Sequence, residues 1–568
     1  MDKSFISKIF LLITIVFLIG NAVAISRDYQ DSWILEGLEI PFILFVVTYA
    51  VAFFFEKREL WLLPLAMAAR TVFLLVPNIK YFWFQGVYID QWNQYYLANH
   101  VLNHGYISQT LSAYSSSPLL HLSFSVFSSI LNISLNDSMK YLPVLWGLTY
   151  PLLVYLIANR IRFSQGQTIT KYALFLSSIP FSNLSYVVTG TMFGIVLAFF
   201  AISAIVLSFE ERNRRYFFLL AFFAVCLSAS HSITSFLFSL ILVLVLAFQM
   251  IPFFRLRSKL RIQHVLVVLL ISVTWLVFQV KSAFQEILYQ IFVATPRGVT
   301  PASESISETF FAHLRANPLS GFRSFSVFYG ADGFFLILAI AGMLIMVKFR
   351  KKLSGAANFL LLLGLASLLL TIVGSFIKLG GPRAWQFFML LIPLFSSIFL
   401  VWANKRKWLR KWFLPTIFFS IFLFSAIELY ACQPIVPSAN VLYKNLPPSV
   451  PMSYANHVNT VYQRQLVSFA YRYAVGTIAT TDPTSTQIAG LAENSNASFR
   501  VINYFPLDTT QFRQEYDLYL INIPGKSGYP NVKKEFAQVN VQNAFILNYS
   551  IVYTNGESYM LANNNPKP

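Results

Sequence analysis

The stretch GVYIDQWNQYYLANHVLNHGYI, residues 86–107, separates apolar segments of this chain with a polar and aromatic insert. It follows the apolar segment Leu60 to Pro77 and carries Asp90. A carboxylate among amide, imidazole and aromatic side chains is costly inside a lipid bilayer. We therefore predict that this stretch lies as a loop at one face of a membrane, where it is a candidate reaction site, and that the rest of the chain is its scaffold.

The composition outside this stretch defines the class of protein. Of 568 residues, 56% are hydrophobic and only 11% are charged, and the mean hydropathy is +0.60. Soluble domains carry about 25% charged residues. Apolar runs recur along the first 430 positions, each near the roughly 20 residues that cross a bilayer as a helix. Barrel strands would instead alternate over ~10-residue segments, so we predict an α-helical polytopic membrane protein.

The apolar runs predict 13 transmembrane helices. The first is read as a retained anchor rather than a signal peptide, because further spans follow it. The predicted spans are 9–25, 38–54, 60–77, 140–158, 172–188, 190–208, 216–231, 234–252, 264–280, 331–347, 356–376, 385–402 and 413–430.

Basic residues predict the orientation of these spans. Alternate loops and the N-terminus hold 23 of the 42 Lys and Arg residues and only five acids. Short loops rich in Lys and Arg stay in the cytoplasm. The pI of 9.7 is thereby explained by topology, and we expect no nucleic-acid partner. The N-terminus is predicted to be cytoplasmic.

The longer segments fall on the opposite, extracytoplasmic side. They are the loops 78–141 and 281–330 and the tail 431–568, and five N-x-S/T sequons lie on this side at Asn132, Asn136, Asn183, Asn496 and Asn548. The chain thus divides into a transmembrane hairpin (1–59), a main transmembrane domain (60–430) and a C-terminal domain (431–568). The short, serine-rich segment 117–131 is predicted to be a helix lying in the outer interface, because counting it as a span would reverse the charge pattern.

Strand-like segments and a short helix-like segment follow one another in the tail, and this order predicts a small α/β domain. Strands are expected at 477–482, 500–505 and 517–523, with a short helix at 485–493. The end, SIVYTNGESYMLA (550–562), predicts a hairpin with its turn at Asn555-Gly556. A Pro-rich connector, 433–451, precedes this domain.

The order of these parts resembles the GT-C glycosyltransferases, polytopic enzymes that take sugar from a polyprenyl-phosphate carrier at the outer face of a membrane. The resemblance depends on the outer aspartate Asp90, SPLL at 117–120, KYLP at 140–143, YLIANRIR at 155–162, a span that begins near His231 and the turn GGPRAW at 380–385. The plan, with a small outer domain containing YTNG (553–556), is most similar to archaeal and bacterial members. It implies a GT-C-like fold over residues 60–430.

Two departures narrow what the resemblance implies. Many protein mannosyltransferases of this class carry Asp-Glu in the first outer loop, whereas this chain has Asp90-Gln91. The Trp-Trp-Asp motif of oligosaccharyltransferase catalytic subunits is absent from the sequence. Transfer of a whole oligosaccharide to protein is therefore disfavoured, and transfer of one sugar stays open.

The expected chemistry indicates which residues form the site. Inverting transfer from a sugar phosphodiester needs a base for the acceptor proton and cations for the departing phosphate. Asp90 is the candidate base; its alternative is an N-cap for a helix 91–104. Arg383 is the candidate phosphate clamp, or else an interfacial anchor. Arg70, inside a span, needs a partner and could meet the phosphate, meet Asp90 or snorkel outward.

Histidines and aromatic residues complete the predicted site. His231, in ASHSIT (229–234), resembles a recurring histidine of the class near the carrier phosphate, and a polar helix end is the alternative. His100 and His104 share one helix face, as metal ligands can, but an ordinary interfacial face is favoured. With Trp92 and Tyr95 they are candidates for binding the acceptor or the sugar. No metal or other cofactor is required by the sequence, and participation of a divalent cation is left open.

The sequence thus predicts a cell-membrane glycosyltransferase that uses a polyprenyl-phosphate sugar donor and a protein, glycan or lipid acceptor outside the cytoplasm. Two alternatives are retained. A transporter or lipid flippase would commonly show repeated halves or ionisable groups near the midplane, whereas the predicted spans contain hardly any acidic residues and no repeat is detected in this sequence. A catalytically inactive GT-C scaffold that binds glycans would keep the fold without a working Asp90.

Overall fold

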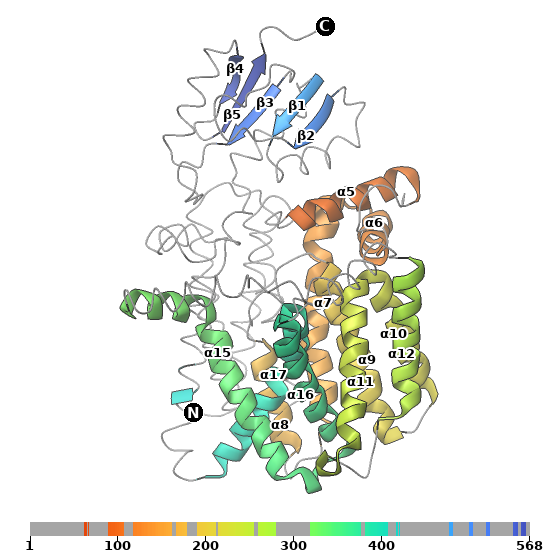
Figure 1. The fold of residues 1–568 in the computed structure, drawn as a ribbon, viewed down its shortest axis with the longest axis vertical. Helices are drawn as coiled ribbons and strands as arrows, with labels where there is room; N and C mark the ends of the chain where they lie inside the picture. Colours follow the sequence, from red (N-terminus) through yellow and green to blue (C-terminus); the bar gives the residue numbers. More distant parts are fainter. Residues whose placement is uncertain are drawn as a thin grey trace, which may run out of the picture.

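The computed structural model of the chain describes residues 62–64, 66–67, 89–106, 117–161, 166–178, 190–211, 214–254, 260–279, 318–376, 381–406, 416–417 and 420, and five strands between residues 476 and 563 (Figure 1). Predicted features that fall on other residues lie outside this description. They include the spans 9–25 and 38–54 and most of 60–77 and 413–430.

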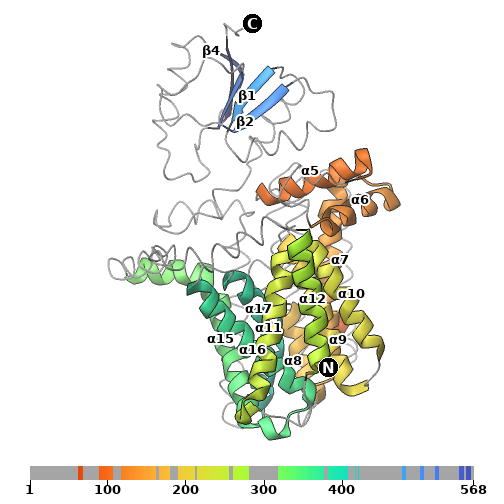
Figure 2. The ribbon, with the colours of Figure 1, turned by 45° about the vertical axis from the view of Figure 1, so that its right-hand side comes forward.

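Apolar helices form an elongated bundle (Figures 1 and 2). Its members are α7 (Leu135–Ala158), α8 (Gly166–Ser178), α9 (Gly190–Glu211), α10 (Arg214–Ser230), α11 (Ser232–Met250), α12 (Ile262–Phe278), α15 (Pro318–Lys348), α16 (Gly355–Phe376) and α17 (Gly381–Asn404). Segments of five of them, α7, α9, α11, α16 and α17, are long and apolar enough to cross a membrane. Because helices pair their own backbone groups within lipid, this architecture and the composition make the chain a multi-pass membrane protein.

Most predicted spans in the described part of the chain coincide with these helices to within a few residues. Two boundaries were wrong. Helix α15 begins at Pro318, 13 residues before the predicted start at 331, and so extends into the predicted loop 281–330; proline is well suited to the first turn, where its missing N–H costs nothing. Helix α8 begins at Gly166, six residues before the predicted 172. The total of 13 spans stays a prediction.

One end of the bundle, called here the basic end, gathers the short loops that carry Lys and Arg. Two contacts join its loops: Ser354 Oγ donates to the carbonyl of Arg160 at 3.5 Å, and the Arg350 guanidinium lies 3.8 Å from the ring centroid of Phe253. Phe253 belongs to the 3₁₀ turn η2 (Pro252–Phe254), and Arg350 to η4 (Arg350–Lys352). The alternation seen in the sequence therefore places basic residues from separate loops at one end of the molecule.

Helices α5 (Ile89–His104) and α6 (Leu119–Leu131) lie across the opposite end, called here the α5 end (Figures 1 and 2). Within the stretch 86–107, predicted to lie in an outer loop, 16 residues form helix α5. The helix predicted at 117–131 is present as α6, which buries Leu120 and Phe124 and exposes Leu122, Val126 and Ile130. The exposed row has i, i+4, i+8 spacing, as expected of a helix with one apolar face to lipid.

Small residues allow the most intimate packing in the bundle, where α15 and α16 meet α17. A Cβ added to Gly342 of α15 would overlap the backbone carbonyl of Phe395, and one added to Gly364 of α16 would lie 2.7 Å from the Phe395 ring. Phe395 itself is 1% exposed. Gly342 thus faces the backbone of Phe395 and Gly364 faces its ring, the small-residue packing that brings membrane helices close together.

Hydroxyl groups join helices inside the bundle. Tyr150 of α7 donates to the carbonyl of Leu390 at 3.2 Å. Leu390 lies three residues before Pro393 of α17. In α11 and α12, Ser235 Oγ lies 2.6 Å and Ser239 Oγ 2.9 Å from Ser272 Oγ. These bonds satisfy buried polar groups that lipid could not.

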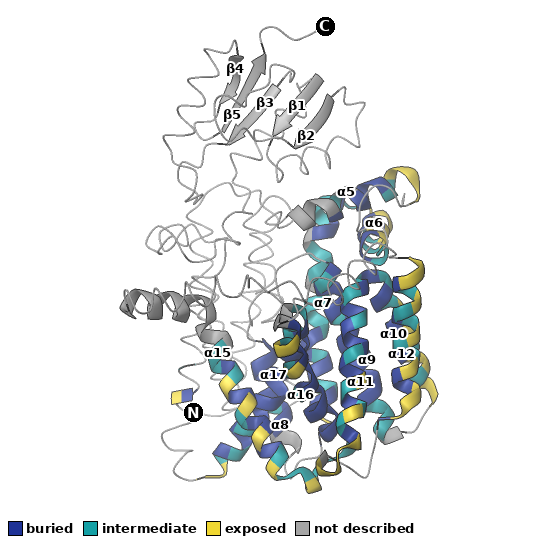
Figure 3. Ribbon diagram, viewed as in Figure 1, coloured by how far each residue is buried: buried dark blue, intermediate teal, exposed yellow. Residues whose placement is uncertain are grey.

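Burial follows from this arrangement. The facing sides of α9, α16 and α17 are buried, whereas the outer faces of α10 and α12 are exposed (Figure 3). The exposed side chains are aliphatic or aromatic, as for lipid contact: Phe218, Phe222, Leu266 and Leu270.

The tail contains a five-stranded sheet in the order β2-β1-β3-β5-β4. Strands β1 (Gly476–Thr480), β2 (Phe499–Asn503) and β3 (Leu518–Asn522) pair in parallel, and β3, β5 (Ser558–Asn563) and β4 (Tyr549–Thr554) pair antiparallel. Strands occur at all the predicted places. The helix 485–493 and the turn Asn555-Gly556 lie outside the described residues, and the membrane side of this domain stays a prediction.

We predict that Gly342→Ala strongly destabilises the protein, whereas Gly333→Ala on the same helix does not. Position 333 has no atom within 4 Å of an added Cβ. Overpacking a close contact costs about 1–3 kcal/mol or more, while alanine in an open helical position is favoured over glycine. Thermal unfolding in detergent would measure both. Equal melting temperatures for the two variants would contradict the described contact between α15 and α17.

Candidate functional site

Helix α11 contacts both α9 and α17, and His231 at its start lies against Thr191 at the start of α9 and within reach of the charge of Arg383 at the start of α17. Each helix start presents backbone N–H groups without helical acceptors and the positive end of the helix dipole. Anions, phosphate above all, bind at such helix starts. These helix starts therefore have a positive backbone character, whereas the side-chain charge is concentrated at the basic end.

Arg383 lies in the first turn of α17, on the side facing α11. Phe387, one turn later, stacks on Phe238 of α11 with ring centroids 5.8 Å apart and planes at 11°. Because residues four apart share a helix face, Arg383 lies towards the start of α11. Its charge acts on His231, the residue immediately before α11. The structure thus brings together two of the residues predicted from the sequence, 152 positions apart.

His231 is the N-cap of α11. Its Nδ1 accepts from the backbone N–H of Thr234 at 3.2 Å and lies 2.8 Å from Thr234 Oγ1. Since Nδ1 accepts a backbone proton, the neutral ring carries its hydrogen on Nε2, which lies 3.2 Å from Thr191 Oγ1 at the start of α9. His231 therefore joins the starts of α9 and α11, as the alternative prediction of a polar helix end implies.

His231 lies between α10 and α11, outside both helices. Burial, and secondly the positive charge of Arg383, lower the pKa of His231 from 6.5 to about 3. Desolvation and a neighbouring cation both disfavour the imidazolium form. The ring is consequently neutral at physiological pH and acts through fixed hydrogen bonds.

Asp90 is the second residue of α5, which begins at Ile89. The predicted helix 91–104 is therefore present but starts slightly earlier, and Asp90 lies in its first turn rather than at its cap. An aspartate at a first-turn position is generally favourable to the helix dipole. The side chain of Asp90 lies outside the described residues, as do the side chain of Trp92 and the whole of Arg70.

Beyond Asp90, α5 packs onto α6. Leu97 and Ala98 are fully buried, Gln94 is 1% exposed, and Tyr95 packs against the core. Ser125 Oγ of α6 donates to the carbonyl of Ala98 at 2.8 Å. These contacts hold the helix that carries Asp90 across the end of the bundle.

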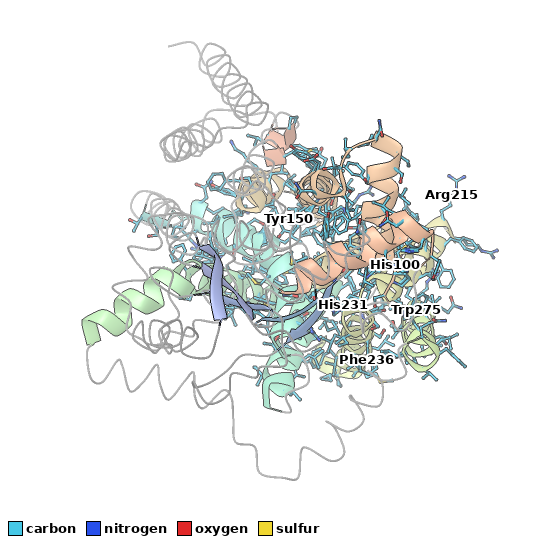
Figure 4. All side chains as sticks on the ribbon, turned by 90° about the horizontal axis from the view of Figure 1, so that it is seen from above. His100, Tyr150, Arg215, His231, Phe236 and Trp275 are labelled. Atoms are coloured by element: carbon cyan, nitrogen blue, oxygen red, sulfur yellow. The ribbon has the colours of Figure 1, made fainter. Side chains whose placement is uncertain are left out.

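His100 and His104 stack on the same face of α5, with ring centroids 4.3 Å apart. Tyr106 meets the His100 ring edge-on at 5.4 Å, and His104 Nδ1 lies 3.1 Å from the carbonyl of His100. Within the described residues no group of three or more His, Cys, Asp or Glu side chains is placed to hold a metal ion. Figure 4 shows His100 and His231 from above, together with Tyr150 of α7.

Two features of this end were not predicted. Gly190 and Gly194 allow α9 to approach His231, because an added Cβ would lie 3.2 Å from its Cδ2 at position 190 and 3.3 Å from its Cβ at position 194. The sequence signal was present, since GTMFG (190–194) has the small-xxx-small spacing of close helix contacts. The second feature is Gln386, one turn after Arg383, which no local pattern distinguishes.

Comparison with known proteins gives structural similarity without sequence similarity. No protein-family model matches the chain, and no match is found among curated protein sequences. The chain is similar to the crystal structure of the Archaeoglobus fulgidus oligosaccharyltransferase tethered with an acceptor peptide, with 12% identity and a TM-score of 0.46 over 89% of this chain and 74% of that one. It is also similar to the arabinofuranosyltransferase AftD from mycobacteria, with 12% identity and a TM-score of 0.48 over 90% of this chain. It spans 42% of the length of AftD.

We predict that the N-cap role of His231 makes stability depend on pH in a defined direction. Its pKa is lower in the folded state than in the unfolded state, where it is about 6.5. The unfolded chain therefore takes up a proton first, so this contribution is complete above pH 6.5 and is lost as the pH falls from there towards 3. Between pH 7 and pH 5, the melting temperature of the wild type should fall more than that of His231→Asn, since asparagine caps without titrating.

His231→Ala provides the control for the cap. It should lower the melting temperature at every pH, because it leaves the Thr234 N–H without this acceptor. Melting curves of wild type and His231→Asn that shift in parallel with pH would contradict the assignment.

Proposed function

We propose that the chain is a membrane glycosyltransferase that transfers one sugar from a polyprenyl-phosphate-linked donor to an acceptor at the extracytoplasmic face. The observation that carries the proposal is the convergence of Arg383, the capped start of α11 and the N-termini of α9 and α17 at the α5 end. A donor phosphate is the kind of group such a convergence would hold.

The proposed phosphate site combines two sources of positive potential. Arg383 offers a fork of N–H donors that matches phosphate oxygens, and the helix starts offer backbone N–H groups. His231, neutral and held by Thr191 and Thr234, positions the helix starts instead of supplying charge. This refines its predicted role from phosphate ligand to positioning residue.

The proposed base is Asp90. The acceptor hydroxyl would lose its proton to the Asp90 carboxylate while its oxygen forms a bond to the anomeric carbon. The bond from that carbon to the phosphate oxygen breaks, and its electron pair leaves with polyprenyl phosphate, with inversion at the sugar. Asp90 belongs to α5, which crosses one end of the bundle (Figure 1), and Arg383 lies in the first turn of α17.

The basic end supports an orientation of the protein in the membrane. Lys and Arg in short loops favour the cytoplasm, so the opposite end, with α5, α6 and the proposed site, would face outward. The C-terminal sheet lies beyond the α5 end (Figure 1), as expected for an outer domain near the acceptor. The acceptor is proposed to be a protein, glycan or lipid.

The test is transfer of labelled sugar from a panel of polyprenyl-phosphate sugars in membranes that contain the protein. Asp90→Asn should lower the transfer rate roughly 100- to 10,000-fold, the usual contribution of a general base. Arg383→Gln should raise the KM for the donor roughly 10- to 100-fold, because charged hydrogen bonds contribute about 1.5–3 kcal/mol. Release of polyprenyl phosphate should accompany transfer in a one-to-one ratio.

Asp137→Asn is the matched control. Asp137 lies in the first turn of α7 and interacts with the N-cap Ser134, whose Oγ is 2.6 Å from its Oδ2. This variant should transfer sugar at close to the wild-type rate. If no donor is consumed, or if Asp90→Asn and Asp137→Asn are equally active, the proposed function is wrong, and transport or glycan binding without catalysis would be tested next.

A further inference from the structure

Two residues are proposed to act in transfer, Asp90 and Arg383. One helical turn after each of them, the chain has a glutamine. Gln94 comes four residues after Asp90 on α5, and Gln386 comes three residues after Arg383 on α17. Residues three or four apart share a helix face. Positions 90 and 94 therefore lie on one face of α5, and positions 383 and 386 on one face of α17.

Both glutamines bury a carbonyl oxygen that lacks a partner. In the described part of the chain, Gln94 Oε1 and Gln386 Oε1 are inaccessible to solvent and have no hydrogen bond. Gln94 as a whole is only 1% exposed. Buried polar atoms are nearly always hydrogen-bonded, and an exception calls for an explanation.

The chemistry of the unpaired atom selects its partner. A carbonyl oxygen only accepts, so the missing group must be a donor. Phosphodiester oxygens are acceptors and do not fit. The hydroxyl groups of a sugar are donors and do fit, as in sites that recognise a substrate by pairing buried polar groups.

The proposed reaction also places the sugar between the two helices. Its anomeric carbon must lie between the acceptor oxygen, near Asp90, and the phosphate, near Arg383. Gln94 and Gln386 lie one helical turn from these two residues, on the helices that would border the sugar ring. We propose that Gln94 and Gln386 accept hydrogen bonds from hydroxyl groups of the donor sugar and determine which sugar is transferred; this rests on the proposed function.

The experiment measures binding of two lipids to the purified full chain in nanodiscs: undecaprenyl phosphate, and the same lipid carrying glucose, mannose, galactose or arabinofuranose. Gln94→Leu and Gln386→Leu should each weaken binding of the preferred sugar-bearing lipid roughly 3- to 10-fold, the value of one neutral hydrogen bond. Neither should change the affinity for undecaprenyl phosphate. Arg383→Gln should weaken the binding of both lipids.

Gln249→Leu is the matched control. Gln249 is also buried, at 6% exposure, with Nε2 unpaired within the described residues, but it lies near the basic end of α11. This variant should leave both affinities unchanged. All three leucine variants should melt at or above the wild-type temperature without lipid, because each removes an unpaired buried polar group. Lower melting temperatures for Gln94→Leu and Gln386→Leu would indicate structural roles and overturn the inference.

The remaining outcomes separate this inference from the proposed function. If the wild type binds neither lipid, the proposed function itself fails. If it binds both lipids equally, or if the two variants keep the wild-type preference for the sugar-bearing lipid, the hydroxyl contacts are wrong while phosphate binding stands. If Gln386→Leu weakens the binding of both lipids equally, the Gln386 side chain would be assigned to the phosphate, and this result would also overturn the inference.

Discussion

The contact between Phe395 and two glycines is the constraint on which the rest of the structure depends. The Phe395 carbonyl occupies the space that any side chain at position 342 would need, and its ring lies against Gly364. Helix α17 is therefore fixed against α15 and α16 over the middle of the bundle. The same helix carries Arg383 at its start, and its Phe387 stacks on Phe238 of α11. The position of Arg383 beside His231 follows from packing some distance below it.

Several buried hydroxyl groups inside the bundle are paired. Tyr150 pairs with a carbonyl near a proline, and the serines of α11 and α12 pair with one another. Such pairing is what a chain in lipid requires. Gln94 and Gln386 depart from it beside the residues proposed for catalysis. Local departures from the rules of stability are expected at functional sites, where a substrate completes the structure.

The sequence predicted those elements whose signal is contained in one apolar run. Helices α9, α11 and α16 match their predicted spans because a run of that length has one stable form in lipid. The start of α15 was missed because residues 318–330 are less apolar than a span, although Pro318 marks a helix start. The proximity of Arg383 to His231 depends on helix packing across 152 positions, which no local pattern encodes. The GTMFG spacing at 190–194 did signal close approach and was not used.

The central claim is that a polyprenyl phosphate binds at the α5 end, and photo-crosslinking tests it most directly. Undecaprenyl phosphate with a diazirine on its first isoprene unit would be activated in membranes containing the wild type, and the labelled peptides mapped with and without excess unmodified lipid. The account predicts competable labelling at the starts of α9, α11 and α17 and in α5. Labelling confined to the basic end, or spread over the exposed faces of α10 and α12 and insensitive to competitor, would contradict it.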